Sequence, residues 1–133
     1  MKANDQTQSE ILSTIRSFFD AYSRRDLPAV MALFVPDPDI VFIGTESDEL
    51  LIGMNAISER FQSDWSRTDE MSMELRWHSI SGGSDVCWLA AEVMVNVSAE
   101  RNKLQLPARI TVVLERRMEH WFISHWHASL PME

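Results

Sequence analysis

Cysteine, glycine and basic residues are all scarce in this sequence. Cys87 is the only cysteine, so no disulfide can form within the chain, and its apolar neighbours indicate a small buried residue rather than a nucleophile. Only four glycines occur in 133 residues, and none of them belongs to a phosphate-binding motif. The pair Gly82-Gly83 instead predicts a hairpin turn.

Positive charge is too sparse for a polyanion-binding surface. Twelve Lys and Arg residues stand against twenty Asp and Glu residues, which gives a net charge of −8. An acidic protein repels phosphate groups, and no basic stripe reverses that locally. The composition therefore argues against nucleic acid and anionic membrane as partners.

Long apolar runs are also missing. No run reaches the length of a membrane span, and the polar first ten residues lack the apolar core of a signal peptide. We therefore expect a cytoplasmic protein, with residues 1–8 as a flexible N-terminus. The length predicts one domain over residues 1–133 that needs neither metal nor disulfide to fold.

The hydrophobic pattern predicts helices first and strands afterwards. Helical spacing covers residues 10–24, a short segment from Pro28 to Phe34 with Asp26 as its N-cap, and residues 54–67. β-Branched and alternating runs predict strands at 40–43, 50–52, 71–81, 85–98, 104–117 and 120–130. Short connections between the last four strands favour an antiparallel meander, and the order as a whole predicts an α+β fold.

Two segments near the C-terminus carry a recognisable pattern. An R-x-T strand at 109–114 precedes W-x-I-x-H-x-H-x-S-x-P at 121–131. This hairpin resembles that of SnoaL-like domains in the nuclear transport factor 2-like superfamily, and it is similar to the end of the calcium/calmodulin-dependent kinase II association domain. The resemblance implies a cone-shaped fold whose helices pack on a curved sheet around a pocket. It leaves the activity open, because one cone hosts isomerases, cyclases, dehydratases and non-catalytic hubs.

The resemblance also shows which catalytic groups are missing. Ketosteroid isomerases use an aspartate base together with a tyrosine and a protonated aspartate that stabilise the dienolate. The corresponding positions in this chain fall on Phe18, on or beside Gly44, and near Ile110. None of these side chains can donate or accept a proton, so we do not expect that reaction here.

Glu92 is the predicted catalytic residue. Strand alternation places it on one face with Trp88, Ala90 and Met94, and the resemblance implies that this face lines the cone. A carboxyl group in apolar surroundings is suited to general acid–base chemistry in a cofactor-independent isomerase or lyase. The alternatives are that Glu92 lies at the rim or binds an arginine of a partner.

The histidines of the last strand favour a structural role. His125 and His127 share a face with Trp121, Ile123 and Ser129, and Arg109 and Thr111 share a face of the preceding strand. The resemblance places this face away from the pocket, where we expect a hydrogen-bonded network or a dimer contact made by Arg109, Thr111, His125, His127 and Ser129. A metal site completed by His78 or Glu115 is the weaker alternative, so no metal or other cofactor is predicted.

The acidic residues around the first two short strands have no ligand spacing. Asp37, Asp39, Glu46, Asp48 and Glu49 lack the order of a calcium loop and predict a solvated loop.

The predicted pocket is mostly aromatic. On the last strand we expect Phe122 and Trp126 to face the helices, together with Ala128 and Leu130. The expected lining comprises Phe18, Tyr22, Phe42, Phe61, Trp65, Trp88, Val112 and Trp126. Val112 occupies the position of a cavity arginine in the kinase hub, which argues against an anionic ligand of that kind.

Two functions follow from these patterns. The first is a domain that binds a small apolar or polycyclic molecule, with isomerase or lyase chemistry at Glu92. The second is a non-catalytic association module. A homodimer is compatible with both.

Overall fold

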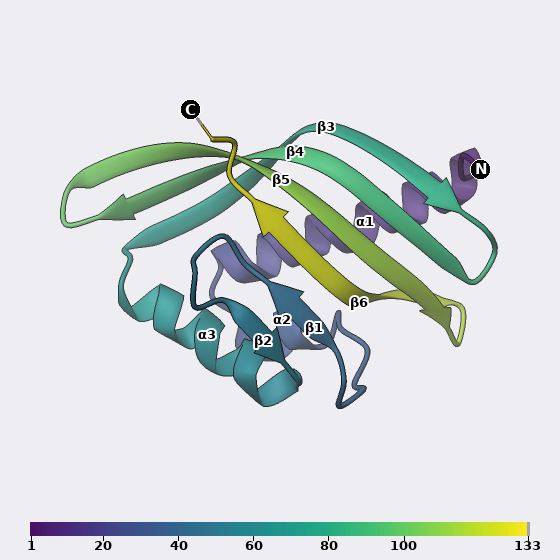
Figure 1. The fold of residues 1–133 in the computed structure, drawn as a ribbon, viewed down its shortest axis with the longest axis horizontal. Coiled ribbons are helices and arrows are strands. Elements are labelled where there is room, and N and C mark those ends of the chain that lie inside the picture. Colours follow the sequence, from purple (N-terminus) through teal and green to yellow (C-terminus); the bar gives the residue numbers. More distant parts are fainter. Residues whose placement is uncertain (133) are drawn as a thin grey trace.

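Three helices occupy the first half of the chain in the computed structural model, which describes residues 1–132 (Figure 1). Their bounds are α1 Asp5–Ser23, α2 Leu27–Met31 and α3 Met54–Ser66. Asp26 caps α2 as predicted, because its Oδ1 accepts a hydrogen bond from Ala29 N at 3.1 Å.

Six strands form one curved sheet in the order β2-β1-β6-β5-β4-β3. The pair β1–β6 is parallel and the others are antiparallel, which confirms the α+β fold with a C-terminal meander. The bounds are β1 Val41–Ile43, β2 Leu50–Ile52, β3 Glu70–Gly82, β4 Val86–Ala99, β5 Asn102–Arg117 and β6 His120–Ser129.

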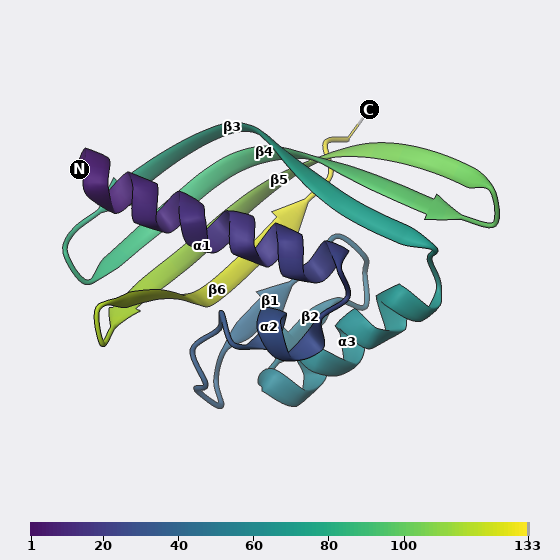
Figure 2. The same cartoon turned by 180° about the vertical axis from the view of Figure 1, so that it is seen from behind.

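Helix α1 covers one face of this sheet, as Figure 2 shows from behind. Its apolar stripe is fully buried at Ile11 and Ile15 and nearly so at Phe18. Helices α2 and α3 lie on the side of β1 and β2, away from β3 and β4 (Figure 1).

The N-terminus differs from the prediction of a flexible segment over residues 1–8. Asn4 caps α1 by accepting a hydrogen bond from Thr7 N at 2.8 Å. Ala3 is buried and its N–H bonds to Ile80 O at 3.1 Å, which ties the chain to β3.

A bulge in β6 reverses the faces of the predicted alternation. Val113 pairs with His125 but Leu114 pairs with Ile123, so Ser124 is the extra residue, and its hydroxyl bonds to Val113 O at 3.1 Å. Trp126 is therefore buried toward the helices, as predicted. Before the bulge, the prediction that Phe122 faces the helices and that Trp121 and Ile123 face away is wrong, because Trp121 and Ile123 are the buried residues.

Candidate functional site

A cavity of about 370 Å³ lies between the curved sheet, the C-terminal part of α1, α3 and the turn between β1 and β2. Its apolar wall comes from every layer of the fold. The side chains that form this wall are Phe18, Phe42, Phe61, Met71, Met73, Val93, Val95, Val97, Leu104, Leu106, Ala108, Ile110, Trp126, Ala128 and Leu130. The exposed Leu104 and Leu130 mark its open side.

Stacked rings form the rigid end of the cavity. Phe42 and Trp126 are adjacent across β1 and β6, and their ring centroids are 5.3 Å apart with planes inclined by 8°. Phe18 approaches Trp126 at 4.8 Å, and Phe61 approaches Phe42 at 5.5 Å. Such contacts hold large side chains in fixed positions and so preform the wall.

Five of the eight predicted lining residues face this cavity, namely Phe18, Tyr22, Phe42, Phe61 and Trp126. Trp65 lies behind the wall and packs on the Tyr22 ring at 5.4 Å. Val112 is completely buried in the core between sheet and helices. Trp88 is 40% exposed because it projects from the opposite face of the sheet.

Glu92 shares the orientation of Trp88, so the prediction that it faces the cavity is wrong. On β4 the buried residues are Leu89, Ala91 and Val93, and Glu92 between them is exposed. It lies in a small surface groove of about 160 Å³ with Arg76 and Arg109. The predicted alternation of β4 is correct, but the face assigned to the cavity is the wrong one: Leu89, Ala91 and Val93 point inward, and Trp88 and Glu92 point outward.

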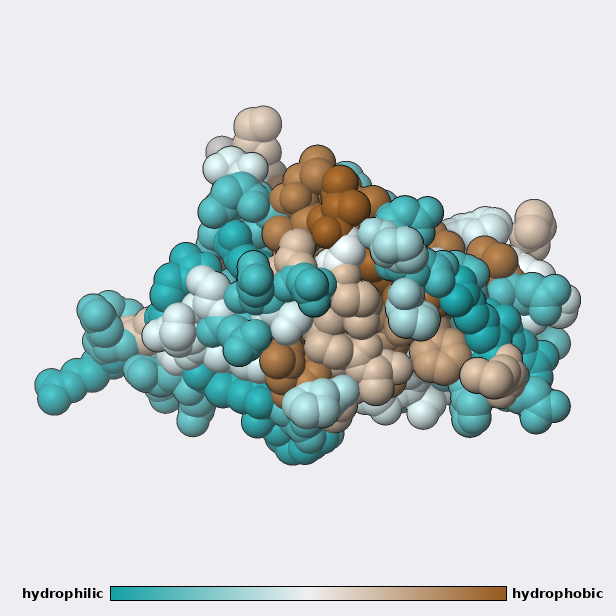
Figure 3. Space-filling model, turned by 90° about the horizontal axis from the view of Figure 1, so that it is seen from below, coloured by the Kyte–Doolittle hydropathy of each residue, from teal (hydrophilic) through white to brown (hydrophobic). Residues whose placement is uncertain are grey.

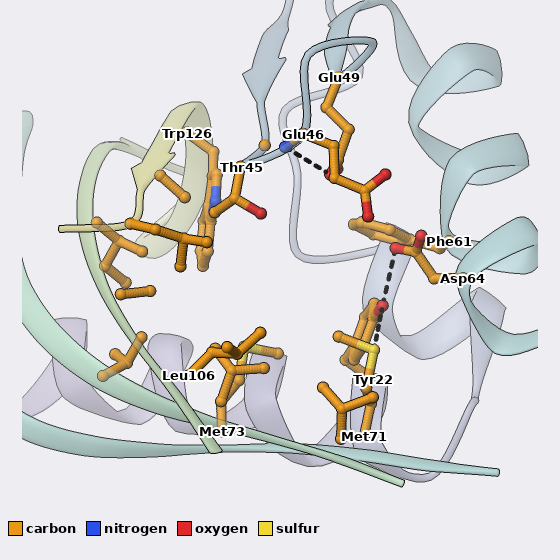
Figure 4. A pocket seen from close by; sticks show the side chains of 18 of the residues that line it. Tyr22, Thr45, Glu46, Glu49, Phe61, Asp64, Met71, Met73, Leu106 and Trp126 are labelled. Atoms are coloured by element: carbon orange, nitrogen blue, oxygen red, sulfur yellow. Dashed lines mark hydrogen bonds between the residues drawn. The ribbon is translucent and has the colours of Figure 1, made fainter. Parts of the chain in front are cut away.

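The polar end of the cavity centres on Tyr22, a residue that is 3% exposed. Its hydroxyl donates to Asp64 Oδ2 on α3 at 3.0 Å and lies 3.5 Å from Met71 Sδ (Figure 4). Burial, and then the negative charge of Asp64, raises the pKa of the Tyr22 hydroxyl far above its usual range. Tyr22 therefore remains protonated and donates to Asp64.

Arg60 connects Asp64 to the acidic turn between β1 and β2. Its guanidinium is 10% exposed, and it bonds through Nε to Asp64 Oδ1 at 3.2 Å. It also lies 3.1 Å from Asp48 and 3.2 Å from Glu49, and it bonds to Glu46. The acidic turn is therefore anchored to α3. The sequence predicted only a solvated loop, so this prediction is corrected.

Asp37 precedes β1 and has its partner, Arg117, on another part of the surface. Arg117 donates to both of its carboxylate oxygens, at 3.0 and 2.6 Å. These hydrogen bonds hold the pKa of the Asp37 carboxyl below its usual range.

Glu49 is the carboxylate that the sequence did not single out within the acidic turn. Its side chain is 11% exposed and lines the cavity, and its Oε1 accepts a hydrogen bond from Glu46 N at 3.3 Å. Burial raises the pKa of the Glu49 carboxyl, and the positive charge of Arg60 opposes that shift. Figure 4 shows Glu46 and Glu49 above Tyr22 and Asp64, with Met73 and Leu106 on the opposite wall.

Glu49 also occupies the space that a side chain at Gly44 would fill. A Cβ atom at Gly44 would lie 2.0 Å from Glu49 Oε2. Phe18, Gly44 and Ile110 all line the cavity, so the three isomerase positions are inside it without their usual groups. The cavity does contain the hydroxyl of Tyr22, one helical turn after Phe18, and the carboxylate of Glu49.

The predicted residues of the other face of the sheet are neighbours across strands, but their side chains form no hydrogen-bonded network within residues 1–132. Thr111 pairs with His127 and Arg109 pairs with Ser129 across β5 and β6, and His125 lies beside Val41 of β1. Within residues 1–132 the side chains of these five residues make no hydrogen bonds to one another. The five residues share a face, and their backbone pairing is the link between them.

No group of three or more His, Cys, Asp or Glu side chains in the described part of the chain has an arrangement suited to a metal ion. None of the helices described is both long enough and apolar enough to cross a bilayer.

The comparisons with known proteins agree with this architecture. The family model for the SnoaL-like domain matches residues 11–133, whereas none of the curated proteins matches the sequence.

Solved structures show the same fold at low sequence identity. A candidate dehydratase of the nuclear transport factor 2-like family from Streptomyces avermitilis superposes with a TM-score of 0.88 at 14% identity, covering 97% of this chain and 99% of that chain. A superfamily protein from Salmonella enterica gives 0.87 at 18%, covering 98% and 95%. A candidate calcium/calmodulin-dependent kinase II association domain from Xanthomonas campestris gives 0.83 at 21%, covering 93% and 87%.

Proposed function

The chain belongs to the SnoaL-like domain family, and we propose that its cavity binds a small, largely apolar molecule. The observation that carries the proposal is a preformed cavity of about 370 Å³ with an aromatic wall and a single polar end. Small-molecule sites have this size and composition, with a few polar groups that orient the ligand.

In this proposal Glu49, and not Glu92, is the general acid or base. Glu92 lies outside the cavity, whereas Glu49 is inside it and burial raises the pKa of its carboxyl. A raised pKa brings a carboxylate closer to the range in which it exchanges protons at neutral pH. Isomerase or lyase chemistry without a cofactor would therefore use Glu49. The Streptomyces relative is described as a candidate dehydratase, and dehydration is a lyase reaction.

Binding can be measured with N-phenyl-1-naphthylamine, a neutral probe whose fluorescence rises in apolar surroundings. We expect saturable binding by the wild type and at least about a tenfold weaker affinity in Ala108→Phe, which places a ring in the cavity. The matched control is Ala90→Phe, because Ala90 lies on the neighbouring strand and faces away from the helices. Circular dichroism checks that both variants fold. Absence of saturable binding by the wild type, or equal loss in the two folded variants, contradicts the proposal.

A second candidate is association through the outer face of the sheet. Trp77 and Trp88 are 54% and 40% exposed there, and Leu50 and Ile52 on edge strand β2 are 65% and 59% exposed. Figure 3 shows the molecule from the side on which β1, β2 and α3 lie, and hydrophobic residues cluster near the centre of this surface. These side chains lie toward the two edges of the sheet, Leu50 and Ile52 on β2 and the tryptophans on β3 and β4, and exposed apolar groups of this size favour interaction surfaces. The Xanthomonas relative is described as an association domain.

Light scattering measures the mass in solution and so tests association through the outer face. We expect the mass of a homodimer for the wild type. Trp88→Asp should shift the mass toward that of a monomer, while Ala108→Phe should leave it unchanged. A monomeric wild type would refute homodimerisation through this face.

A further inference from the structure

The polar end of the cavity differs from its walls in presenting hydrogen-bond acceptors with almost no free donor. The carboxylates of Glu46, Glu49 and Asp64 all line it, and Arg67 is the one guanidinium that does so. What kind of ligand fits depends on which of these groups is already paired within the protein.

Glu49 has one oxygen bound and one available. Oε1 is held by Arg60 and by Glu46 N, whereas Oε2 accepts no hydrogen bond from any residue in 1–132. Oε2 lies against the Cα side of Gly44, and both residues line the cavity. An apolar ligand would cover this oxygen and leave it without a partner, which is costly for a buried carboxylate.

The buried donors at this end are used within the protein, and Arg67, which keeps unused N–H groups, lies at the exposed edge. The Tyr22 hydroxyl donates to Asp64, so its oxygen can only accept a further hydrogen bond. Thr68 Oγ1 donates to Asp64 O at 2.9 Å. Arg67 bonds to Asp64 Oδ1 at 3.1 Å and to Ser63 O at 3.4 Å, and its side chain is 54% exposed.

Arg60 does not offset the excess of carboxylates that faces the cavity. It is not part of the cavity wall and lies among four carboxylates, those of Glu46, Asp48, Glu49 and Asp64. Counting Arg67, and Arg25 whose guanidinium bonds to Thr68, three positive charges stand against four negative ones around this end of the cavity. Thr45 at the rim is the remaining hydroxyl, and a hydroxyl can act as donor or acceptor.

We propose that this cavity selects molecules whose polar group donates hydrogen bonds, a protonated primary amine above all, with that group bound between Glu49 Oε2 and Tyr22 Oη. The inference rests on the proposed function and adds the chemical class of the ligand. A hydroxyl group fits the same position with a weaker interaction, since it brings no charge. A carboxylate meets like charge and acceptor oxygens in a site of low dielectric, so it is rejected.

Three naphthalene derivatives that differ only in their polar group test the selection. Naphthalen-2-ylmethanamine, naphthalen-2-ylmethanol and naphthalene-2-carboxylic acid each compete with bound N-phenyl-1-naphthylamine at pH 7. We expect the amine to bind at least about tenfold more tightly than the acid, with the alcohol between them. Equal affinity of amine and acid, or a preference for the acid, would overturn the inference.

Substitution of Glu49 locates the selecting group. Glu49→Gln keeps the size of the side chain, and we expect it to weaken amine binding about tenfold more than it changes the affinity for the neutral probe. The control is Glu59→Gln, an exposed residue of the same helix as Arg60, which should change neither affinity. An amine affinity that is the same in Glu49→Gln and wild type refutes the role of Glu49.

Failure of the inference is distinguishable from failure of the proposed function. Wild type that binds the neutral probe but does not discriminate among the three derivatives keeps the cavity as a binding site and removes only the amine preference. Wild type that does not bind the probe removes both.

Discussion

The two faces of the curved sheet contain residues from the same strands but differ in almost every physical property. On β4, Val93 and Val95 line the cavity, whereas Trp88 and Glu92 project into solvent from the other side. The inner face is packed by rings from α1, α3 and two strands, and it has one charged cluster at its end. The outer face has exposed tryptophans and histidines that make no contacts with a second layer of this chain.

This difference shows where stability and selectivity should reside. Substitutions on the inner face remove buried contacts or leave charges unpaired, so they should alter folding and ligand preference together. Substitutions of equal size on the outer face should alter neither in the isolated chain. Four predictions test this contrast, beginning with the largest expected effect.

Phe61→Ala should cause the largest loss. Phe61 is 2% exposed, and its ring lies 5.2 Å from that of Tyr22 and 5.5 Å from that of Phe42. We expect the free energy of unfolding to fall by about 3–5 kcal/mol, as for other buried phenylalanines. Urea denaturation measures this, with Thr111→Ala on the outer face as the comparison. A similar loss in both variants would contradict the contrast between the faces.

Arg60→Met should lower the free energy of unfolding by about 2 kcal/mol, because it leaves Glu49 and Asp64 without their main counter-charge. We place the value below that of a fully buried pair, since Glu46 and Asp48 remain largely in water. Arg24→Met is the matched change at an exposed ion pair with Asp20 and should leave the unfolding midpoint where it was. An effect in Arg24→Met as large as in Arg60→Met would show that the buried position of Arg60 is irrelevant.

Tyr22→Phe should cost about 1–2 kcal/mol at neutral pH, because the hydroxyl donates to a charged acceptor, Asp64. The pKa of Tyr22 is raised in the folded protein, so above about pH 10 the unfolded chain loses this proton first. The folded state then binds more protons than the unfolded state, and stability falls as pH rises. Thermal melts from pH 8 to 11 should therefore bring the two proteins closer together. A gap that widens with pH would rule out this account.

Glu49→Gln should have the smallest effect on stability, visible in its pH dependence. Burial raises the pKa of Glu49 in the folded protein, so between its unfolded value near 4.5 and its folded value the folded state holds the extra proton. Wild-type stability should therefore decrease as pH rises through that window, and this component should be missing in Glu49→Gln. Denaturation midpoints from pH 4 to 8 measure the difference. Parallel pH profiles for the two proteins would exclude the raised pKa.

The elements of the fold were predictable because each depends on neighbours in the sequence. The apolar stripe of α1, the Asp26 cap and the alternation of the last four strands were all visible in the sequence and are present in the structure. The bulge at Ser124 was not predictable, because one extra residue has no local signature. It reversed the faces of Trp121 and Ile123.

The candidate site was only half predictable. Its aromatic wall follows from helical and strand periodicity, which selected Phe18, Phe61 and Trp126. Its polar end depends on contacts between residues far apart in the chain, such as Tyr22 with Asp64 and Arg60 with Glu49. The spacing of Arg60 and Asp64 by four residues on a predicted helix was the one signal available.

What the sequence determined by itself is the set of elements, the acidic balance and the apolar character of the cavity, since these depend on composition and on periods of two and 3.6 residues. Only the tertiary structure decided which face of β4 lines the cavity, and so moved the carboxylate of interest from Glu92 to Glu49. The physical reason is that alternation divides a strand into two equivalent faces, and the choice between them is made by the helices that pack on one face. The same packing brings Glu49 out of water and against Arg60, which no local pattern encodes.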